Sequence, residues 1–228
     1  MGTAIALMLP FLGTAAGAAC VFFIKKQISM NLQRVFTGFA AGVMVAASVW
    51  SLLIPAMDMS ESMGKFAFFP ALVGFLLGIV FLLFMDNLIP HLHVGSDHPE
   101  GQKSNLGRSA MMFLAVTIHN LPEGIAAGVS FGTENTAQAL TVAAGIALQN
   151  IPEGMVIIAP MIAAGISKRK TLLIALATGA VEVIGTFIGY FAVSISAAVL
   201  PFALAFAGGT MLYVVSDEMI PETHAHGS

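Results

Sequence analysis

The stretch His119-Asn120-Leu121-Pro122-Glu123-Gly124 decides the fold, because it recurs 30 residues later as Gln149-Asn150-Ile151-Pro152-Glu153-Gly154. Each copy lies inside an apolar stretch, the first over residues 107–131 and the second over residues 137–165. A helix needs about 20 apolar residues to cross the roughly 30 Å hydrocarbon core of a bilayer. The repeat therefore predicts two membrane-spanning helices, each with a polar motif near its centre.

The composition of the whole chain also indicates a membrane protein. Of its 228 residues, 57% are hydrophobic and only 9% are charged, whereas an average soluble domain is about 25% charged. A soluble fold of this size would have too few charged side chains to cover its surface. The single cysteine, Cys20, argues against a disulfide framework and a Cys-rich zinc module, and no basic run suits a nucleic-acid partner.

Five further apolar stretches have the same character, at residues 3–24, 35–57, 66–90, 171–195 and 199–220. Backbone groups in lipid must form hydrogen bonds within their own segment, so each stretch is expected to be a helix. The first stretch lacks the basic region that begins a signal peptide, which favours a spanning helix. The sequence thus predicts an all-α integral membrane protein with one transmembrane domain over residues 1–228 and seven spanning helices.

Lysine and arginine residues predict how the chain is oriented. Eight of the nine lie in the predicted loops on one side, and only Lys65 lies on the other. Basic residues accumulate on the cytoplasmic side of membrane proteins, so we expect a multi-pass protein of the cell membrane with its N-terminus outside. The eight are Lys25, Lys26, Arg34, Lys103, Arg108, Lys168, Arg169 and Lys170.

Glycine pairs at a spacing of four residues predict close helix packing. Such pairs let helix backbones approach each other inside a membrane. They indicate a compact bundle and carry no information about a substrate. The pairs are Gly13/Gly17, Gly38/Gly42, Gly74/Gly78, Gly124/Gly128 and Gly185/Gly189.

Three carboxylates, Glu123, Glu153 and Glu182, lie near the centres of predicted spans. Each costs about 2.5–3.5 kcal/mol at that depth on insertion scales. No lysine or arginine lies inside a predicted span to neutralise them, so they are either protonated or hold cations. For Glu182 both alternatives stay open, because a protonated side chain could bond to Thr178 or Thr186 instead of a metal.

Helical geometry favours cations at the two motifs. Positions four residues apart differ by about 40° around a helix, so Glu123 falls between His119 and Asn120. The second motif repeats this arrangement on a helix that runs in the opposite direction. Each glutamate can therefore contact two neighbouring ions, which predicts a two-metal site. Nitrogen and oxygen ligands without thiolate favour zinc, iron or manganese.

The prolines of the motifs, Pro122 and Pro152, also indicate function. Each removes a helix hydrogen bond and frees a carbonyl four residues earlier, at Ile118 or Leu148. Transporters commonly have interrupted helices beside a binding site at the bilayer midplane. A simple proline kink is the alternative, but two prolines in the same polar motif favour a binding site.

A second polar cluster lies in and beside the predicted loop between residues 90 and 107. It is either a solvated loop or a weak metal-collecting patch, and the sequence leaves both open. Its members are Asp86, His91, His93 and His98, and a weaker group of the same kind is His224 and His226.

Two other membrane functions are less compatible with the sequence. A two-metal membrane enzyme could activate water, but the chain has no His-Glu-x-x-His motif and no spare carboxylate beside the repeat to act as a base. A seven-helix retinal protein needs a lysine inside a span, and every lysine here lies in a predicted loop. We therefore expect a transporter and not an enzyme.

The repeated motif resembles the ZIP (Zrt/Irt-like) metal transporters, particularly their GufA-like branch, and the resemblance extends over the whole chain. It implies transport of Zn²⁺, and also Fe²⁺, Mn²⁺ or Cd²⁺, towards the cytoplasm as substrates, with no cofactor. It also implies an eight-helix 3+2+3 bundle that forms homodimers. The sequence ends after the seventh predicted helix, at residues 223–228, so the eighth helix is expected to be absent from this chain.

The resemblance further implies a role for individual residues. One ion would be bound by Met44, His119, Gln149, Glu123 and Glu153, although Met44 alone would be taken for ordinary packing. The other would be bound by Asn120, Asn150, Glu182, Glu123 and Glu153. The entrance is matched by Ser51 and Asp58, and the cytoplasmic exit by Asp86, His91, His93, Asp217 and Glu218.

Overall fold

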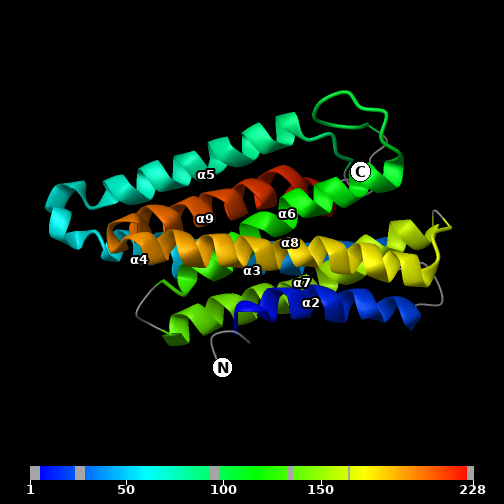
Figure 1. Ribbon diagram of the computed structural model, residues 1–228, viewed down its shortest axis with the longest axis horizontal. Coiled ribbons are helices and arrows are strands. Elements are labelled where there is room, and N and C mark those ends of the chain that lie inside the picture. The colour runs from blue at the N-terminus through cyan, green and yellow to red at the C-terminus, as the bar shows by residue number, and fades with distance from the viewer. Residues whose placement is uncertain (1–5, 24–28, 93–97, 133–135, 164, 225–228) are drawn as a thin grey trace.

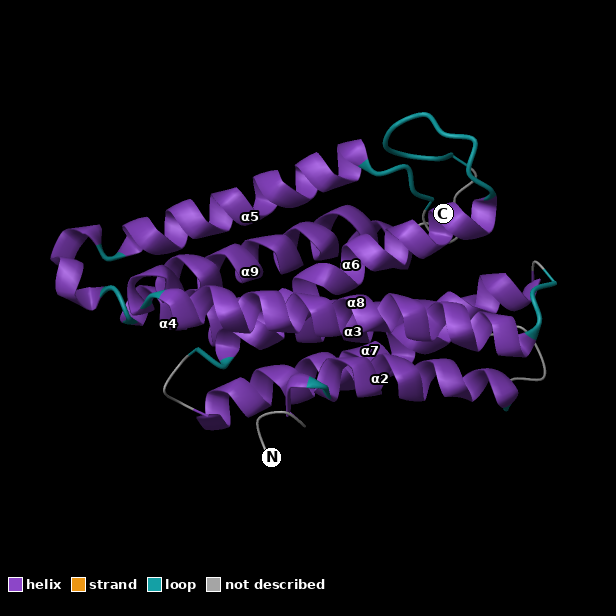
Figure 2. Ribbon diagram, in the orientation of Figure 1, coloured by secondary structure: helices purple, strands orange, loops and turns teal. Residues whose placement is uncertain are grey.

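The computed structural model describes residues 6–23, 29–92, 98–132, 136–163 and 165–224. Within these ranges the regular elements are helices, and the β contact there is one isolated bridge between His91 and Glu100. Figure 2 shows the helices running along the long axis, with loops mostly at its two ends. The predicted all-α class is confirmed.

The elements follow one another as a series of long helices. They are α2 (Leu9–Ala19), α3 (Met30–Ala46), α4 (Ile54–Asp58), α5 (Phe68–Leu88), α6 (Arg108–Ser130), α7 (Thr136–Ala163), α8 (Lys168–Ile195), α9 (Leu200–Val214) and α10 (Ile220–His224). Two π-helical segments, η2 (Ala47–Leu53) and η5 (Val215–Met219), join α3 to α4 and α9 to α10. Short 3-10 turns are η1 (Cys20–Phe22), η3 (Glu61–Phe66) and η4 (Ala197–Val199).

Several helices begin earlier than the apolar pattern predicts. The second predicted helix starts at Met30 and not at residue 35, because the Ser29 hydroxyl caps it by accepting a hydrogen bond from the backbone N–H of Leu32 at 3.4 Å. Similarly, α8 starts at Lys168. Arg34 and the basic residues of α8 therefore lie in helices and not in the loops where they were predicted.

The last helix also extends further than predicted. It continues through η5 and α10 to His224, where the sequence pattern predicts an end near residue 220. The first predicted helix is described as Leu9–Phe22; of its other predicted residues, 6–8 precede α2, Phe23 is a turn, and the rest lie outside the described ranges.

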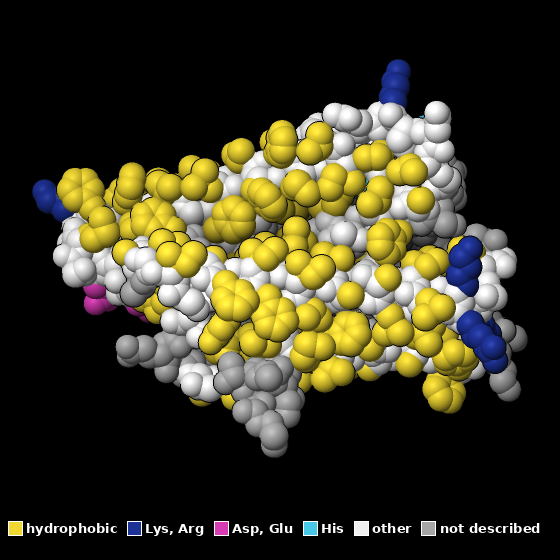
Figure 3. Space-filling model, in the orientation of Figure 1, with side chains coloured by type: hydrophobic (Ala, Val, Ile, Leu, Met, Phe, Trp, Pro, Cys, Tyr) yellow, Lys and Arg dark blue, Asp and Glu magenta, His cyan; other side chains and the backbone are white. Residues whose placement is uncertain are grey.

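The outer surface suits a lipid environment. By length and hydropathy, four of the described helices could cross a membrane, and Leu9–Phe22 is a shorter apolar helix. The four are Met30–Asp58, Phe68–Leu88, Lys168–Ile195 and Leu200–His224; α6 and α7, which carry the polar motifs, are not among them. Figure 3 shows apolar side chains over the length of one face and basic side chains near its ends. The chain is a multi-pass membrane protein.

The helices pack in pairs, with α6 along α8, α5 along α9 and α2 along α7. Glycine makes the first of these contacts possible. A Cβ added at Gly124 or Gly128 would overlap the backbone oxygens of Glu182 and Thr186 on α8. Helix α6, which carries the first motif, and α8, which carries Glu182, are therefore in backbone contact beside Glu123.

Three of the other four glycine pairs behave as predicted. The 13/17 pair meets the backbone of α7, the 74/78 pair meets α9, and the 185/189 pair meets α6. The remaining pair does not reach another helix backbone: a Cβ at Gly38 would contact only a Thr223 methyl group, and one at Gly42 would meet no described atom within 4 Å. A packing role is therefore supported for four of the five pairs.

The two helices with π segments form an antiparallel pair. Each π segment is followed at once by an Ile-Pro step, at residues 54–55 and 220–221. In the pair, α4 packs against α9 and α10 packs against α3. Figure 1 shows α4 at one end of the bundle. The irregular halves of these helices therefore lie towards opposite ends, and π segments often mark functional sites.

Candidate metal centre

The two motifs come together between α6 and α7, near the middle of both helices. His119 Nε2 lies 3.6 Å from Glu123 Oε1 and 3.6 Å from Glu153 Oε1, and these three atoms lie within 4.8 Å of one another. Around a tetrahedral zinc ion with bonds of about 2.0–2.2 Å, ligand atoms are about 3.4 Å apart. The spacing is too long for hydrogen bonds and suits an ion held between the three atoms.

Both motifs have side chains with buried polar atoms that form no hydrogen bond in the described part of the chain. A polar atom buried in this way costs about 1–3 kcal/mol unless something binds it. For Asn120, a half-turn of the amide exchanges nitrogen and oxygen, so either atom can face a ligand. The atoms are His119 Nε2, Asn120 Nδ2, Glu123 Oε2, Gln149 Oε1, Asn150 Oδ1 and Glu153 Oε1.

Gln149 connects the two motifs directly. Its Nε2 donates to Glu123 Oε1 across the α6–α7 contact at 2.5 Å. Both side chains are fully buried. This hydrogen bond fixes the orientation of the Glu123 carboxylate and leaves its second oxygen as a buried acceptor.

Glu182 on α8 is paired more completely. Its Oε1 accepts a hydrogen bond from the Thr14 hydroxyl of α2 at 2.6 Å, and its Oε2 accepts one from Asn150 Nδ2 at 3.1 Å. The Asn150 amide also donates to the Pro10 carbonyl at 3.2 Å. Three helices therefore meet at this carboxylate.

The partners of Glu182 differ from those that the sequence suggested. The hydroxyl of Thr178 donates to the Ala175 carbonyl, and the hydroxyl of Thr186 donates to the backbone carbonyl of Glu182, so neither bonds to the carboxylate. Thr14 does so instead, from a helix 168 residues away in the chain. The one sequence signal for Thr14 was a hydroxyl between Gly13 and Gly17, on a face expected to pack closely.

Comparisons with known proteins show the family to which the chain belongs. A family model described as "ZIP Zinc transporter" matches residues 93–228. The zinc transporter GufA of Myxococcus xanthus is 42% identical over 220 residues, which cover 94% of this chain and 86% of the relative. The chain belongs to the ZIP family.

Other members of the ZIP family are similar over the same extent of the chain. The human zinc transporter ZIP11 is 35% identical over 299 aligned positions, covering 94% of this chain and 87% of the relative. The zinc transporter ZIPB of Bordetella bronchiseptica is 36% identical over 220 residues, covering 95% of this chain and 71% of the relative. These relatives are named as transporters and not as enzymes.

A fourth carboxylate lies closer to the centre of this ZIP protein than expected. Glu218, predicted to lie near the end of the last helix, lies in η5, and its Oε2 is 3.3 Å from His119 Nδ1. Metal-binding histidines usually donate their other ring N–H to a carboxylate or carbonyl. An Nδ1–H directed at Glu218 would leave the Nε2 lone pair facing Glu123 and Glu153. The neighbouring Asp217 is exposed.

Met44 lies in the apolar packing around the motifs. Its side chain is fully buried in a cluster that includes Ile118 and Ile146, each of which precedes a motif in the chain. It is also close to the start of the π segment η2. Pro122 and Pro152, by contrast, do not end their helices, since α6 and α7 continue through them.

The residues predicted to form the entrance lie at the α4 end of the bundle (Figure 1). Ser51 is part of η2, and its carbonyl accepts a hydrogen bond from Gln138 Nε2 of α7 at 3.2 Å. Asp58, the last residue of α4, is exposed.

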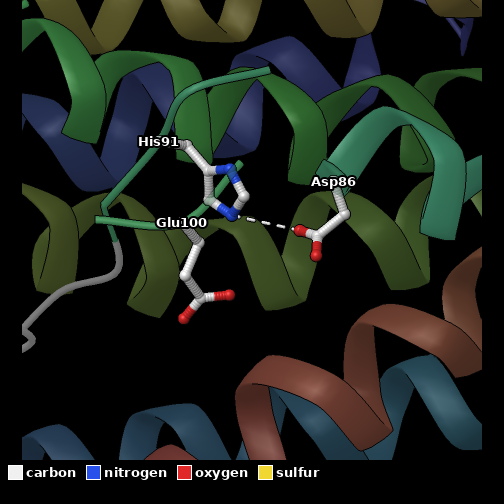
Figure 4. A group of neighbouring side chains, drawn as sticks. All are labelled: Asp86, His91 and Glu100. Atoms are coloured by element: carbon white, nitrogen blue, oxygen red, sulfur yellow. Dashed lines mark ion pairs between the residues drawn. The ribbon is translucent and has the colours of Figure 1, made fainter. Parts of the chain in front are cut away.

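In the predicted exit cluster, His91 is buried and Asp86 is partly buried, whereas His98 is exposed. Figure 4 shows Asp86, His91 and Glu100 around one space, with His91 Nε2 3.0 Å from Asp86 Oδ1. His91 is only 1% exposed, and its Nδ1 lies 2.8 Å from the Ile89 carbonyl. A carbonyl can only accept, so Nδ1 carries a proton and Nε2 faces the carboxylate. His93 lies outside the described residues.

Proposed function

We propose that this ZIP protein transports Zn²⁺ across the membrane through the centre between α6 and α7. The observation that carries the proposal is the position of His119 Nε2 3.6 Å from both Glu123 Oε1 and Glu153 Oε1, with one ligand atom of each residue within 4.8 Å of the others. These atoms lie deep in the bundle, where their mutual repulsion and their lost hydration are costly. A divalent cation offsets both costs.

Zinc is the favoured substrate for two reasons. Imidazole and carboxylate suit it without a thiolate, which permits release. Similar proteins such as GufA and ZIP11 are named zinc transporters. Fe²⁺, Mn²⁺ and Cd²⁺ accept the same ligand types and are further candidate substrates.

The centre is proposed to hold two ions, with Glu123 and Glu153 shared between them. The first subsite consists of His119, Gln149 and Met44 with the two shared glutamates, and the second subsite consists of Asn120, Asn150 and Glu182 with the same glutamates. Glu123 supports the sharing, because Oε1 faces His119 and Gln149 while Oε2 is buried without a partner.

The proposed ion path runs from one end of the helix bundle to the other. We propose seven spans, made by the four long apolar helices together with α2, α6 and α7, in a homodimer of the cell membrane with the N-terminus outside. Eight of the nine basic residues support this orientation. Ions would enter past Ser51 and Asp58 and leave to the cytoplasm past the acidic and histidine side chains near α10 and the end of α5, namely Asp86, His91, His93, Asp217 and Glu218.

Metal uptake by proteoliposomes tests the proposal. Vesicles that contain the purified chain and a trapped zinc indicator should accumulate Zn²⁺, and Glu123→Gln should reduce the rate to that of empty vesicles. Glu61→Gln, at an exposed carboxylate in η3, is the matched control and should transport at the wild-type rate. Wild-type vesicles that take up none of Zn²⁺, Fe²⁺, Mn²⁺ or Cd²⁺ faster than empty ones would contradict the proposal.

A further inference from the structure

Helix α2 contacts the second subsite through two groups that lie one turn apart. The Thr14 hydroxyl donates to Glu182 Oε1 at 2.6 Å, and the Pro10 carbonyl accepts from Asn150 Nδ2 at 3.2 Å. Thr14 is 3% exposed, Asn150 is 1% exposed and Glu182 is fully buried. These hydrogen bonds are therefore shielded from water, where an alternative partner would be scarce.

The contacts determine which atoms face the centre. Asn150 Nδ2 lies between two acceptors, the Pro10 carbonyl and the Glu182 carboxylate, so the amide cannot be rotated without opposing oxygen to oxygen. Its Oδ1 is consequently directed elsewhere, and it is one of the buried atoms without a partner. Oxygen is also the amide atom that can bind a cation.

Glu182 is held in a similar way. Each carboxylate oxygen accepts one hydrogen bond, from Thr14 or from Asn150, and each keeps a further lone pair. Carboxylates that bind metals are commonly oriented by such hydrogen bonds, and the loss of an outer partner typically costs about 10- to 100-fold in metal affinity.

We propose that α2 is the outer shell of the second subsite, with Thr14 as the positioning residue for Glu182 and the Pro10 carbonyl as the group that orients Asn150. The inference rests on the proposed two-ion function. Close packing transmits the position of α2 to the subsite, because Gly13 and Gly17 lie against the α7 backbone. Neither Thr14 nor Pro10 needs to touch the ion to set its affinity.

Zinc titration calorimetry of the purified full-length chain in detergent tests the inference. Thr14→Val keeps the branched shape and removes the donor, so it should weaken one of two zinc sites by about 10- to 100-fold and leave the other unchanged. Thr14→Ser restores the hydroxyl and should restore the affinity. Thr14→Ala is a second donor-free variant in case the valine variant does not fold, which the melting temperature of the metal-free protein reports.

The matched control is Thr178→Val. Thr178 is as buried as Thr14, but its hydroxyl donates to the Ala175 carbonyl of its own helix, so zinc affinity should not change. Glu182→Gln is the reference for a damaged second subsite. If Thr14→Val and Thr14→Ala keep wild-type affinity at both sites while Glu182→Gln loses one site, the proposed role of α2 is wrong and the two-ion function stands. A wild-type protein that binds fewer than two ions would overturn the two-ion function and this inference together.

Discussion

The two sides of the polar centre differ in how their charges are balanced. On the first side, His119 Nε2 lies 3.6 Å from one oxygen each of Glu123 and Glu153, too far for hydrogen bonds, and only the Glu123 oxygen accepts a further hydrogen bond, from Gln149. On the second side, both oxygens of Glu182 accept hydrogen bonds from neighbouring helices. The second side is therefore stabilised by the protein itself, whereas the first side gains most from an ion. Two buried carboxylates in the same membrane bundle can therefore differ in how much they depend on a bound metal ion.

The largest expected effect is a difference in the number of zinc ions lost when Glu153, proposed to be shared by both ions, and Glu182, proposed to bind one ion, are replaced. Glu153→Gln should abolish zinc binding at both subsites, because in the proposed two-ion centre the lost charge is shared by both ions, while Glu182→Gln should abolish only one. Equilibrium dialysis with metal analysis measures the number of ions bound. If Glu153→Gln still binds one ion with wild-type affinity, the glutamate is not shared and the two sides are independent.

A methyl group at the α6–α8 contact should disturb both sides together. In Gly124→Ala, the new Cβ would overlap the backbone oxygen of Glu182, so α8 must move. Overpacking of this kind costs about 1–3 kcal/mol, and we expect zinc uptake to fall with the melting temperature. Thermal unfolding and vesicle uptake are the measurements.

Gly42→Ala is the matched control for that change. It lies in α3, where an added Cβ meets no described atom within 4 Å. The free energy of unfolding should therefore stay the same or rise by less than about 1 kcal/mol, because alanine favours a helix more than glycine does. If Gly124→Ala and Gly42→Ala lower the melting temperature and the zinc uptake equally, the close contact beside Glu182 is not the cause of the loss.

Asn150→Asp should make the stability of the second side depend on a bound ion, as that of the first side does. The substitution replaces a donor by an acceptor beside the Pro10 carbonyl and the Glu182 carboxylate, which repel it. The metal-free protein should melt at a lower temperature, and saturating zinc should raise that temperature by more than in the wild type, because an ion now relieves the repulsion.

Asn87→Asp is the control for this substitution. Asn87 also donates to a backbone carbonyl, that of Leu83, but it is exposed at the end of α5 and distant from the motifs along the chain. Water can solvate the new carboxylate there, so the melting temperatures of the metal-free and the zinc-saturated protein should not change appreciably. A smaller zinc response in Asn150→Asp than in the wild type would contradict the comparison.

The smallest expected effect concerns the cluster at the end of α5. Asp86→Asn keeps a hydrogen-bonding side chain beside His91 and removes one charge. Zinc affinity at the centre should be unchanged, while the uptake rate should fall by up to about tenfold, the low end of the effects that local charge has on ion flux. A change in affinity without a change in rate would instead assign Asp86 to the centre.

Sequence periodicity determined the parts of the centre that lie within one helix. His119 and Glu123 are four residues apart in a segment that had to be helical in lipid, and their atoms lie 3.6 Å apart. The 30-residue repeat predicted that a second motif would lie opposite, and Glu153 does approach His119. Both results depend only on the helical repeat and on the depth of the motifs, which the order of residues specifies.

The contacts between distant helices were decided by tertiary structure alone. Thr14 reaches Glu182, and Glu218 reaches His119, although α2 and η5 carry no motif that names these partners. A helical repeat specifies which residues share a face, but it does not specify which helix that face will meet. The glycine contacts that bring backbones together select the partner helix and its rotation, and only then does a hydroxyl or carboxylate acquire its neighbour.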